Sequence, residues 1–319
     1  MSVPSDPHPD DPARDGPVRH LKASLYAWIS RRYMPGCSNY NTLEVRRASR
    51  SKRQAREMFA RHGFPHAKGE VFTGFGTARR FAREHGYPLC VKPNVSGFSR
   101  GSHFPIRDAA ELDRACRWVK AWWPTSIVER YLAGANYRVL ATPDRVVSTI
   151  RRYPPFVDGD GASDIDTLID AENATRERMG LYPTMHPIAK NGAARAWLAR
   201  QGLDLASVPP AGVRVNVFNR VALAPGGIVE VIDQATLPEA NRQLFKDVVK
   251  AWDARLFGVD VIFEHGIETD WREQESILLE VNSRPYTRMH SAPRYGEAED
   301  LDAFHAEMDA LNVDDADTF

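Results

Sequence analysis

The chain has 319 residues and a hydrophobic content of 43%, enough for one large or two medium domains. Lys and Arg balance Asp and Glu at 42 each, so the net charge is zero and no bulk field favours nucleic acid or an anionic membrane. Three scattered cysteines (Cys37, Cys90 and Cys116) exclude a disulfide framework and a zinc site, and there is no signal peptide or long apolar span. We therefore expect a soluble, cytoplasmic protein.

Charge is distributed unevenly along the chain. Arg19–Arg56 contains ten Lys or Arg and a single acid, whereas Glu297–Phe319 contains nine acids and no Lys or Arg. We interpret both as solvated segments. A contact between the basic and the acidic segment, within one chain or between subunits, is the alternative.

The first third of the chain passes from a polar tail into alternating elements. Residues 1–18 are rich in Pro and Asp and are expected to be disordered. A short arm over 19–48 follows, with a docked helix predicted over 20–33 and a loop over 34–42. The pattern then predicts helices over 49–62, 77–85 and 108–122 and strands over 87–92 and 125–130.

The remainder of the chain predicts hairpins separated by helices. A hairpin is expected over 137–151, turning at Pro143 and Asp144, and an irregular segment over 181–191. Helices are predicted over 164–179, 193–201 and 239–256, a strand over 213–221, and two apolar strands after residue 257. This mixture indicates an α+β fold rather than a repeat array.

The two last strands, within FGVDVIF and SILLEVNSRP, each carry an acid inside an apolar run. Glu280 and Asn282 are two residues apart, so they share one face of an extended strand, and Asp260 can lie opposite them in a hairpin. Two carboxylates and a carboxamide are oxygen ligands of the kind that magnesium prefers. The alternative is an edge strand with a solvated polar face, and these residues alone leave both interpretations open.

Two other stretches suggest nucleotide binding. Lys92 ends an apolar strand and precedes a loop of small residues up to Ser102, a combination that suits phosphate, although a surface turn with an exposed lysine is the alternative. Val128–Leu132 followed by AGAN is typical of a connector that contacts a purine, or of a plain hinge. A third stretch, Trp118 to Trp123, is interpreted as core or interface rather than as a platform for nucleic acid.

The order of these pieces is more informative than any one of them. A helix bearing Lys52 precedes VKP and the small-residue loop, VERYLAGANYRVL follows, and EVNSRP closes the series. This order resembles the ATP-grasp carboxylate–amine ligases over residues 49–293. RRYPPFVDGDGASDIDTLIDAEN and RQGLDLASVPPAG resemble the branch that includes the ATP-grasp part of cyanophycin synthetase and the bifunctional glutathione synthetases.

The resemblance implies an α+β, ATP-grasp fold whose two subdomains clasp ATP, with a truncated N-terminal domain. The expected divisions are a tail over 1–18, an arm over 19–48, a small subdomain over 49–124, a large subdomain over 125–296 and an acidic tail over 297–319. Family members usually carry a whole domain ahead of this core. We therefore expect a homo-oligomer, such as a dimer, or a partner chain that supplies the missing wall.

The resemblance also implies roles for individual residues. The expected ATP contacts are Lys52, Lys92, Ser96, Gly97, Ser99, Gly101, Ser102, Glu129, Arg130, Tyr131 and Leu132. Asn136 stands where the family usually has an acid for the ribose. Asp260, Glu280 and Asn282 match the magnesium ligands, which favours the metal interpretation of the hairpin.

Other matched residues belong to the reaction itself. Arg284 and Arg288 are the candidate catalytic cations, with Lys190, in a segment that resembles the family's lid, as a γ-phosphate contact. Arg138 and His290 fall in the substrate neighbourhood. The phrase VNVFNRVALAPGG departs from the Arg and the Asn-rich phrase usual in the cyanophycin branch, so a different substrate is expected.

The family's reaction transfers the γ-phosphate of ATP to a carboxylate, and an amine then attacks the acyl phosphate. The implied cofactors are ATP and two Mg²⁺ ions, with Mn²⁺ as a substitute, and the implied substrates are small molecules: a carboxylate of an amino acid or small peptide, and an amine. No nucleic acid or membrane partner is expected. The alternative is a non-catalytic ATP-binding module that works with a partner chain.

Overall fold

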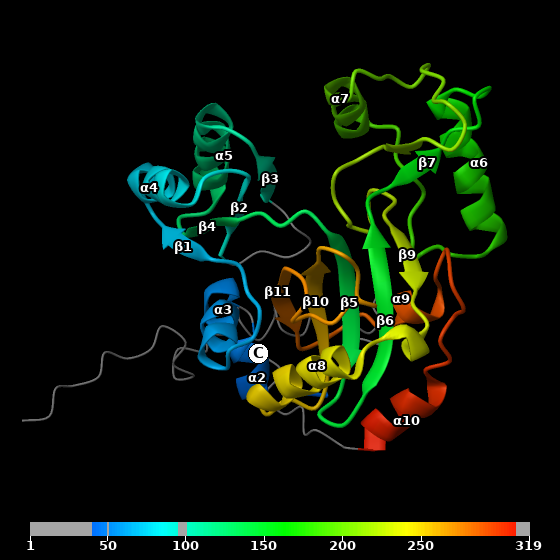
Figure 1. The fold of residues 1–319 in the computed structure, drawn as a ribbon. Coiled ribbons are helices and arrows are strands. Elements are labelled where there is room, and N and C mark those ends of the chain that lie inside the picture. Colours follow the sequence, from blue (N-terminus) through cyan, green and yellow to red (C-terminus); the bar gives the residue numbers. More distant parts are fainter. Residues whose placement is uncertain (1–39, 50, 95–100, 311–319) are drawn as a thin grey trace, which may run out of the picture.

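The computed structural model describes residues 40–49, 51–94 and 101–310. The helix predicted over 20–33, the tail over 1–18 and Ser96, Gly97 and Ser99 lie outside these residues. The described chain forms a central sheet, a small lobe beside it and a third unit above the opposite end of that sheet (Figure 1). Within the described residues, no helix has the length and apolar character needed to cross a membrane.

The small lobe is a four-stranded sheet covered on one face by two helices (Figure 1). Its strand order is β1–β4–β2–β3, with β1 Gly69–Phe72, β2 Leu89–Pro93, β3 His103–Ile106 and β4 Ser126–Arg130. The covering helices are α4 Phe75–His85 and α5 Ala109–Trp122. Their buried apolar side chains pack against Phe72, Leu89 and Val128. Lys92 of β2 and Glu129 of β4 alternate with these buried residues and lie on the opposite face.

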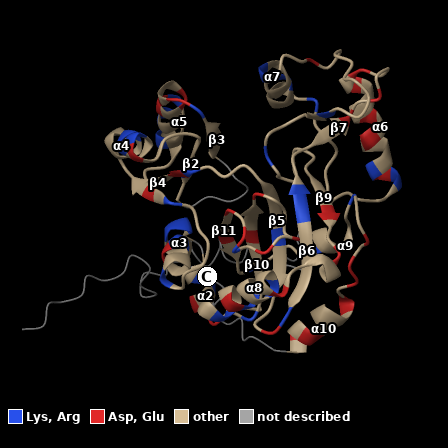
Figure 2. Cartoon of the chain, viewed as in Figure 1, with Lys and Arg blue, Asp and Glu red and all other residues tan. Residues whose placement is uncertain are grey.

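The central sheet has five strands in the order β11–β10–β5–β6–β9. They are β5 Ala135–Ala141, β6 Val146–Tyr153, β9 Ile228–Val231, β10 Phe257–Phe263 and β11 Ser276–Asn282. One face packs against α8 Glu239–Ala251 and α3 Lys52–Arg61, where Phe59, Tyr137, Phe245 and Phe263 are fully or almost fully buried. The other face carries charged residues. Basic residues mark β6 and acidic residues mark β11 at the centre of the molecule (Figure 2).

Both edges of the central sheet are joined to short segments of chain. On β11, the Leu278 N–H donates to the Pro65 carbonyl (3.0 Å) and Leu278 forms a parallel bridge with His66. On β9, the Val231 N–H donates to the Tyr295 carbonyl (3.0 Å), and Glu230 forms a parallel bridge with Tyr295. The segment that leads into the small lobe is therefore bonded to the strand that carries Glu280.

The third unit has its own apolar core. It consists of α6 Ile165–Arg178, α7 Gly192–Arg200 and the short pair β7 Phe156–Asp158 and β8 Arg214–Asn216. Ile165, Ile169 and Leu198 are completely buried in it. The remaining elements are α2 Leu43–Ala48, the 3₁₀ turn Gln234–Thr236, α9 Arg288–Ser291 and α10 Asp302–Ala310.

Most predicted helices and strands are present, but several boundaries were wrong. The predicted helix over 239–256 ends at Ala251, because Asp253 adopts a left-handed φ of 51° and the Ala254 N–H turns back to the Val249 carbonyl. The predicted strand over 213–221 is reduced to Arg214–Asn216, since its partner β7 has only three residues.

The expected divisions also differ from the observed units. β4 belongs to the small-lobe sheet although it lies beyond residue 124, and α3 packs on the central sheet. The acidic segment after residue 297 contains α10, whose Phe304 and Met308 are buried with Tyr40, Leu140 and Leu256. The expectation that this acidic segment is only solvated was therefore wrong, because its helix is amphipathic and buries apolar side chains.

Candidate functional site

The β10–β11 hairpin places its three polar residues as the sequence predicts. Asp260 pairs with Glu280 and Gly258 pairs with Asn282 in the antiparallel register. The three side chains therefore share the face of the sheet that is not packed against α8. Asp260 lies directly opposite Glu280, as expected, whereas Asn282 lies opposite Gly258.

A β-bulge between Asp260 and Val261 explains how an apolar strand presents these residues. Val261 pairs with Leu278, so Leu279 is the extra residue. Leu278 and Val281 are three apart, yet both are buried in the core beneath α8. Leu279 packs in a separate small cluster with Leu132 and Ile277. Because of the bulge, β11 keeps Leu278 and Val281 in the core and also directs Glu280 and Asn282 toward the site.

Asp260 is the centre of a buried cluster of charges. Arg138 donates from Nε to Oδ1 (2.7 Å) and from Nη2 to Oδ2 (2.9 Å), and Arg152 Nη2 lies 3.0 Å from Oδ2. Burial by itself raises the pKa of the Asp260 carboxyl, but the two guanidinium groups outweigh it and the pKa is lowered. Arg152 also donates to Asn136 Oδ1 (2.8 Å). Sequence reasoning missed Arg152, because alternation on β6 was its only signal.

A second charge cluster joins the two lobes. Lys92 Nζ on β2 lies 2.5 Å from Glu129 Oε1 on β4, and both side chains are about one-tenth exposed. Lys52 Nζ at the start of α3 lies 3.7 Å from Glu280 Oε2 on β11. Glu280, Lys92 and Glu129 all act electrostatically on Lys52, and both glutamates act on Lys92. The structure therefore brings together four residues that are spread over 228 positions of the sequence, from Lys52 to Glu280.

Burial and pairing act in opposite directions on the two lysines of this cluster. For Lys52, burial is the largest effect and the pKa of the ammonium is lowered, because the more distant Glu280 compensates only in part. For Lys92, burial also lowers the pKa, but the close ion pair with Glu129 outweighs it and the net shift is upward. Lys92 is therefore firmly charged at neutral pH.

The start of α3 is attached to the end of β2. Ser51 caps the helix by accepting from the Gln54 N–H, and the Lys52 and Arg53 N–H groups donate to the carbonyl and the side chain of Asn94. This contact fixes Lys52 relative to Lys92, although the two residues belong to different lobes.

The predicted connector residues lie at the junction between the lobes. Arg130 is exposed and lies 3.7 Å from Glu275, and Leu132 is buried beside Ala67. The Tyr131 ring stacks with Phe104 at a centroid distance of 6.0 Å. The half-buried Asn136 accepts a hydrogen bond from Arg152.

Gly101 and Ser102 are the described members of the predicted phosphate-covering loop. Gly101 has a φ of +74°, and a Cβ atom there would lie 2.5 Å from the Trp123 ring, so a larger residue would not fit. Ser102 is buried.

Arg284, Arg288 and His290 follow β11. Arg284 is partly buried and Arg288 is exposed at the start of α9. His290 is completely buried, and its Nδ1 lies 2.8 Å from Ser148 Oγ. Burial, together with the charges of Arg138 and Arg152, lowers its pKa to about 3, so this imidazole is neutral.

Lys190 is not among the residues that the structure brings together at the lobe junction. Its Nζ lies 2.9 Å from Asp166 and 2.7 Å from Asp170, both on α6 of the third unit.

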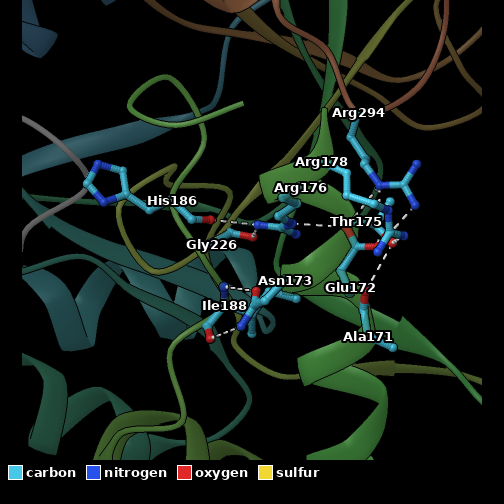
Figure 3. Close-up of polar contacts among 10 residues, drawn as sticks. All are labelled: Ala171, Glu172, Asn173, Thr175, Arg176, Arg178, His186, Ile188, Gly226 and Arg294. Atoms are coloured by element: carbon cyan, nitrogen blue, oxygen red, sulfur yellow. Dashed lines mark hydrogen bonds and ion pairs between the residues drawn. The ribbon is translucent and has the colours of Figure 1, made fainter. Parts of the chain in front are cut away.

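Arg176, on the same helix, connects α6 to the rest of the chain. It binds Glu172 and donates to the His186 (2.7 Å) and Gly226 (2.9 Å) carbonyls (Figure 3). Arg294 binds the same Glu172 from the end of the central sheet (Figure 3).

A cavity of 340 Å³ lies elsewhere, between α3, α4 and β1. Its lining includes Arg56, His66, Lys68 and His85, and none of the predicted nucleotide or metal residues. We therefore assign the site to the lobe junction by its charges rather than to this cavity by its volume.

Two of the three predicted metal ligands fit a magnesium ion better than the third. The Glu280 side chain is 35% exposed. Asn282 donates its amide to the Gly258 carbonyl (3.3 Å), which leaves its carbonyl oxygen for a cation. Asp260 already accepts from two arginines, so it has the least remaining acceptor capacity. The donor set is composed of oxygen atoms, as magnesium requires.

No model of a known protein family matches the chain. The cyanophycin synthetase of Trichormus variabilis is 31% identical over 248 residues, which cover 77% of this chain and 27% of that protein. The crystal structure of a bifunctional glutathione synthetase from Pasteurella multocida superposes with a TM-score of 0.62 and 20% identity, covering 86% of this chain and 38% of that one. The ATP-grasp ligase PsnB, solved with a phosphomimetic variant of a minimal precursor, Mg and ADP, superposes with a TM-score of 0.50 and 15% identity, covering 92% of this chain and 68% of that one.

The chain belongs to the ATP-grasp family, as its α+β fold and its relatives show. Within this family it is similar to the ATP-grasp part of cyanophycin synthetase and of the bifunctional glutathione synthetases. It spans about a quarter (27%) of the length of the cyanophycin synthetase that it matches.

Proposed function

We propose that this protein is an ATP-dependent carboxylate–amine ligase. It transfers the γ-phosphate of ATP to the carboxylate of an amino acid or small peptide, and an amine then displaces the phosphate to form an amide bond. ADP and phosphate are released. The relatives of similar sequence support ligation in general. The acyl-phosphate route is our inference from the family.

The observation that carries this proposal is the meeting of Lys52, Lys92, Glu129 and Glu280 at the lobe junction. These residues come from α3, β2, β4 and β11, so neither lobe makes the cluster alone. Two lysines supply positive charge for phosphate oxygens, and Glu280 with Asn282 supplies oxygen atoms for a cation. Phosphoryl transfer needs such positioning and charge neutralisation more than it needs a protein nucleophile.

In the proposed mechanism, Lys92 and Lys52 bind the phosphates and the connector Glu129–Leu132 positions the base. Glu280 and Asn282 would hold Mg²⁺, with Asp260 orienting the site through Arg138 and Arg152, and the metal neutralises charge on the phosphates when bound. Arg284 or Arg288 stabilises the developing oxyanion at the carboxylate. Lys190 remains a proposed γ-phosphate contact that would have to leave Asp166 and Asp170.

The test is phosphate release from ATP and magnesium across a set of amino acids and dipeptides, each supplied with candidate amines. We expect release that requires one carboxylate and one amine. Glu280→Gln should reduce it by about 100-fold or more, because the change removes a charge from the metal site.

Glu275→Gln is the matched control, since Glu275 is an exposed acid near the same strand, 3.7 Å from Arg130. It should retain full activity, and both variants should unfold at the wild-type temperature. Nucleotide binding without phosphate release for any pair would favour the non-catalytic module. Normal magnesium-dependent turnover by Glu280→Gln would show that the site is assigned wrongly.

A further inference from the structure

The outer side of α5 exposes two tryptophan side chains. Trp118 is 61% exposed and Trp122 is 71% exposed, although the other side of this helix packs against the small-lobe sheet. The two are four residues apart, so they lie one above the other on the same side of the helix. Trp123 differs from them, because it packs against the core of the small lobe. The stretch from Trp118 to Trp123 therefore supplies one residue to the core and two to the surface.

Two exposed indole rings on one side of a helix are unusual for a surface that faces only water. At these exposures the two side chains present on the order of 300 Å² of mostly apolar surface. This is the size of the largest apolar patch on many monomeric proteins, and such a patch commonly marks an interaction site. Tryptophan and arginine are also the residues that most often dominate the binding energy of protein interfaces. We therefore interpret this side of α5 as a docking surface.

The same side of α5 is positively charged. Arg114 and Arg117 are exposed next to the two tryptophans, and neither forms an ion pair within the described residues. The last acid of the helix, Asp113, is held by Arg79 of α4 through two hydrogen bonds (2.9 and 2.8 Å), and Arg117 acts on it only through its charge. The two arginines and the two tryptophans, which we call the α5 face, fit a partner that is acidic and partly apolar.

The chain itself contains a segment of this composition. Residues 311–319, which lie outside the described residues, read LNVDDADTF: three aspartates, a leucine, a valine and a phenylalanine, with no Lys or Arg. They follow directly on α10, which is anchored to the central sheet by the buried side chains of Phe304 and Met308. This anchor fixes where the segment begins. Both the charge and the apolar content of the segment complement the α5 face.

The distance across the molecule assigns this match to two copies of the chain. α5 and α10 lie at opposite ends of the molecule (Figure 1). Nine residues span at most about 30 Å, whereas a compact chain of this length is about 50 Å across. Each copy has one segment and one α5 face, so two copies that exchange their segments satisfy both contacts in a closed dimer.

We propose that the α5 face binds residues 311–319 of a second copy of this chain. The two arginines bind the aspartates, and the two indole rings pack against the apolar side chains of the segment. The two surfaces contain no residue that we assign to nucleotide, metal or substrate. This inference is therefore independent of the proposed function.

Sedimentation velocity of the full-length protein measures the association. The wild-type protein should form dimers, and deletion of residues 311–319 should leave monomers. Trp118→Ala combined with Trp122→Ala should weaken the association by about 10- to 100-fold, because it removes both aromatic anchors. Tyr182→Ala is the matched control, since Tyr182 is an aromatic residue of the third unit that is 65% exposed. It should leave the association unchanged.

An exchange of charges tests whether the two surfaces are partners. One variant carries Arg114→Glu and Arg117→Glu. A second variant carries Asp314→Lys, Asp315→Lys and Asp317→Lys. Each variant alone should be monomeric, because its α5 face and its own segment then have charges of the same sign. An equimolar mixture should form dimers again, because each segment then meets a face of opposite charge. A general loss of folding cannot produce that recovery.

Several results would overturn the proposal. One is a wild-type protein that stays monomeric, and another is a dimer that persists after residues 311–319 are deleted. Loss of dimers in the tryptophan variant, with the aspartate variant unaffected, would show that the α5 face binds a different surface. If the two charge variants were folded by circular dichroism and their mixture stayed monomeric, the arginines and the aspartates would not be partners.

Discussion

The two charge clusters of this protein differ in how far their side chains are shielded from solvent. At Asp260, two guanidinium groups surround one carboxylate, and all three side chains are at most 12% exposed. At the lobe junction, Lys92 and Glu129 are tightly paired, but Lys52 and Glu280 remain 3.7 Å apart with Glu280 35% exposed. The first cluster is a closed structural unit, whereas the second has charge accessible to a ligand.

This difference indicates which charged residues stabilise the fold and which are available to bind a ligand. Buried charges whose partners surround them hold a fold in one arrangement, and removal of one partner leaves the others uncompensated. Loosely paired charges at a junction between lobes have low cost and can be drawn into new contacts. We therefore expect changes at Asp260 to act on stability and changes at the junction to act on binding.

The largest expected effect is on stability. Asp260→Asn removes the charge shared by Arg138 and Arg152, so the free energy of unfolding should fall by about 3–5 kcal/mol. Urea denaturation followed by circular dichroism measures it. If Asp260→Asn unfolded at the wild-type urea concentration, the cluster would be unimportant for the fold, and Asp260 would be available as a full metal ligand.

The next effect is on nucleotide affinity. Lys92→Ala should weaken ATP binding by about 100-fold, because it removes a cation that contacts phosphate. The change also leaves Glu129 without its ion-pair partner, so the double variant Lys92→Met with Glu129→Gln serves as the control, because it removes both charges of the pair. Calorimetry that gave unchanged affinity for both variants would remove Lys92 from the site.

A smaller, pH-dependent effect is expected at His290. Its pKa is about 3 in the folded protein and about 6.5 when unfolded, so the unfolded state binds the proton first as the pH falls. Its contribution is fully present above about pH 6.5 and is lost as the pH falls towards 3. His290→Asn should therefore flatten the stability profile between pH 6 and 4. Parallel profiles for the two proteins would contradict this assignment.

The smallest effect is expected for an exposed pair. Arg79 binds Asp113 through two short hydrogen bonds, 2.9 and 2.8 Å, with the arginine half exposed. Asp113→Asn should leave the urea midpoint unchanged within error, since exposed pairs contribute little. This substitution makes the same chemical change in an exposed ion pair that Asp260→Asn makes in a buried one. A midpoint shift comparable to that of Asp260→Asn would show that burial does not separate the two pairs.

Sequence reasoning located the hairpin and its three polar residues because alternation on strands is short-range. Glu280 and Asn282 are two apart, and the register places Asp260 opposite Glu280 as expected. The ATP-grasp fold followed from the order of the motifs. The roles of Lys52 and Lys92 in binding remain predictions, although the structure places them in one charge network.

Other features depend on contacts that no local pattern encodes. In the sequence Arg152 resembles an ordinary strand residue. Its ion pair with Asp260 forms because β6 lies next to β5 in the sheet, and this pairing is not visible in a local pattern. The extra residue Leu279 cannot be recognised without the partner strand. Arg220 resembles an ordinary loop arginine in the sequence, and its hydrogen bond to the Ser102 carbonyl joins residues 118 positions apart.

The bonds at the two edges of the central sheet restrict how copies of this protein assemble. An open edge strand offers unpaired N–H and C=O groups to any other chain, and such edges promote fibre-like aggregation. Here the segment at Pro65 and His66 occupies part of β11, and Tyr295 occupies part of β9. Sheet extension between copies is therefore hindered at both ends. If this protein forms an oligomer, we therefore do not expect the copies to share a continuous central sheet.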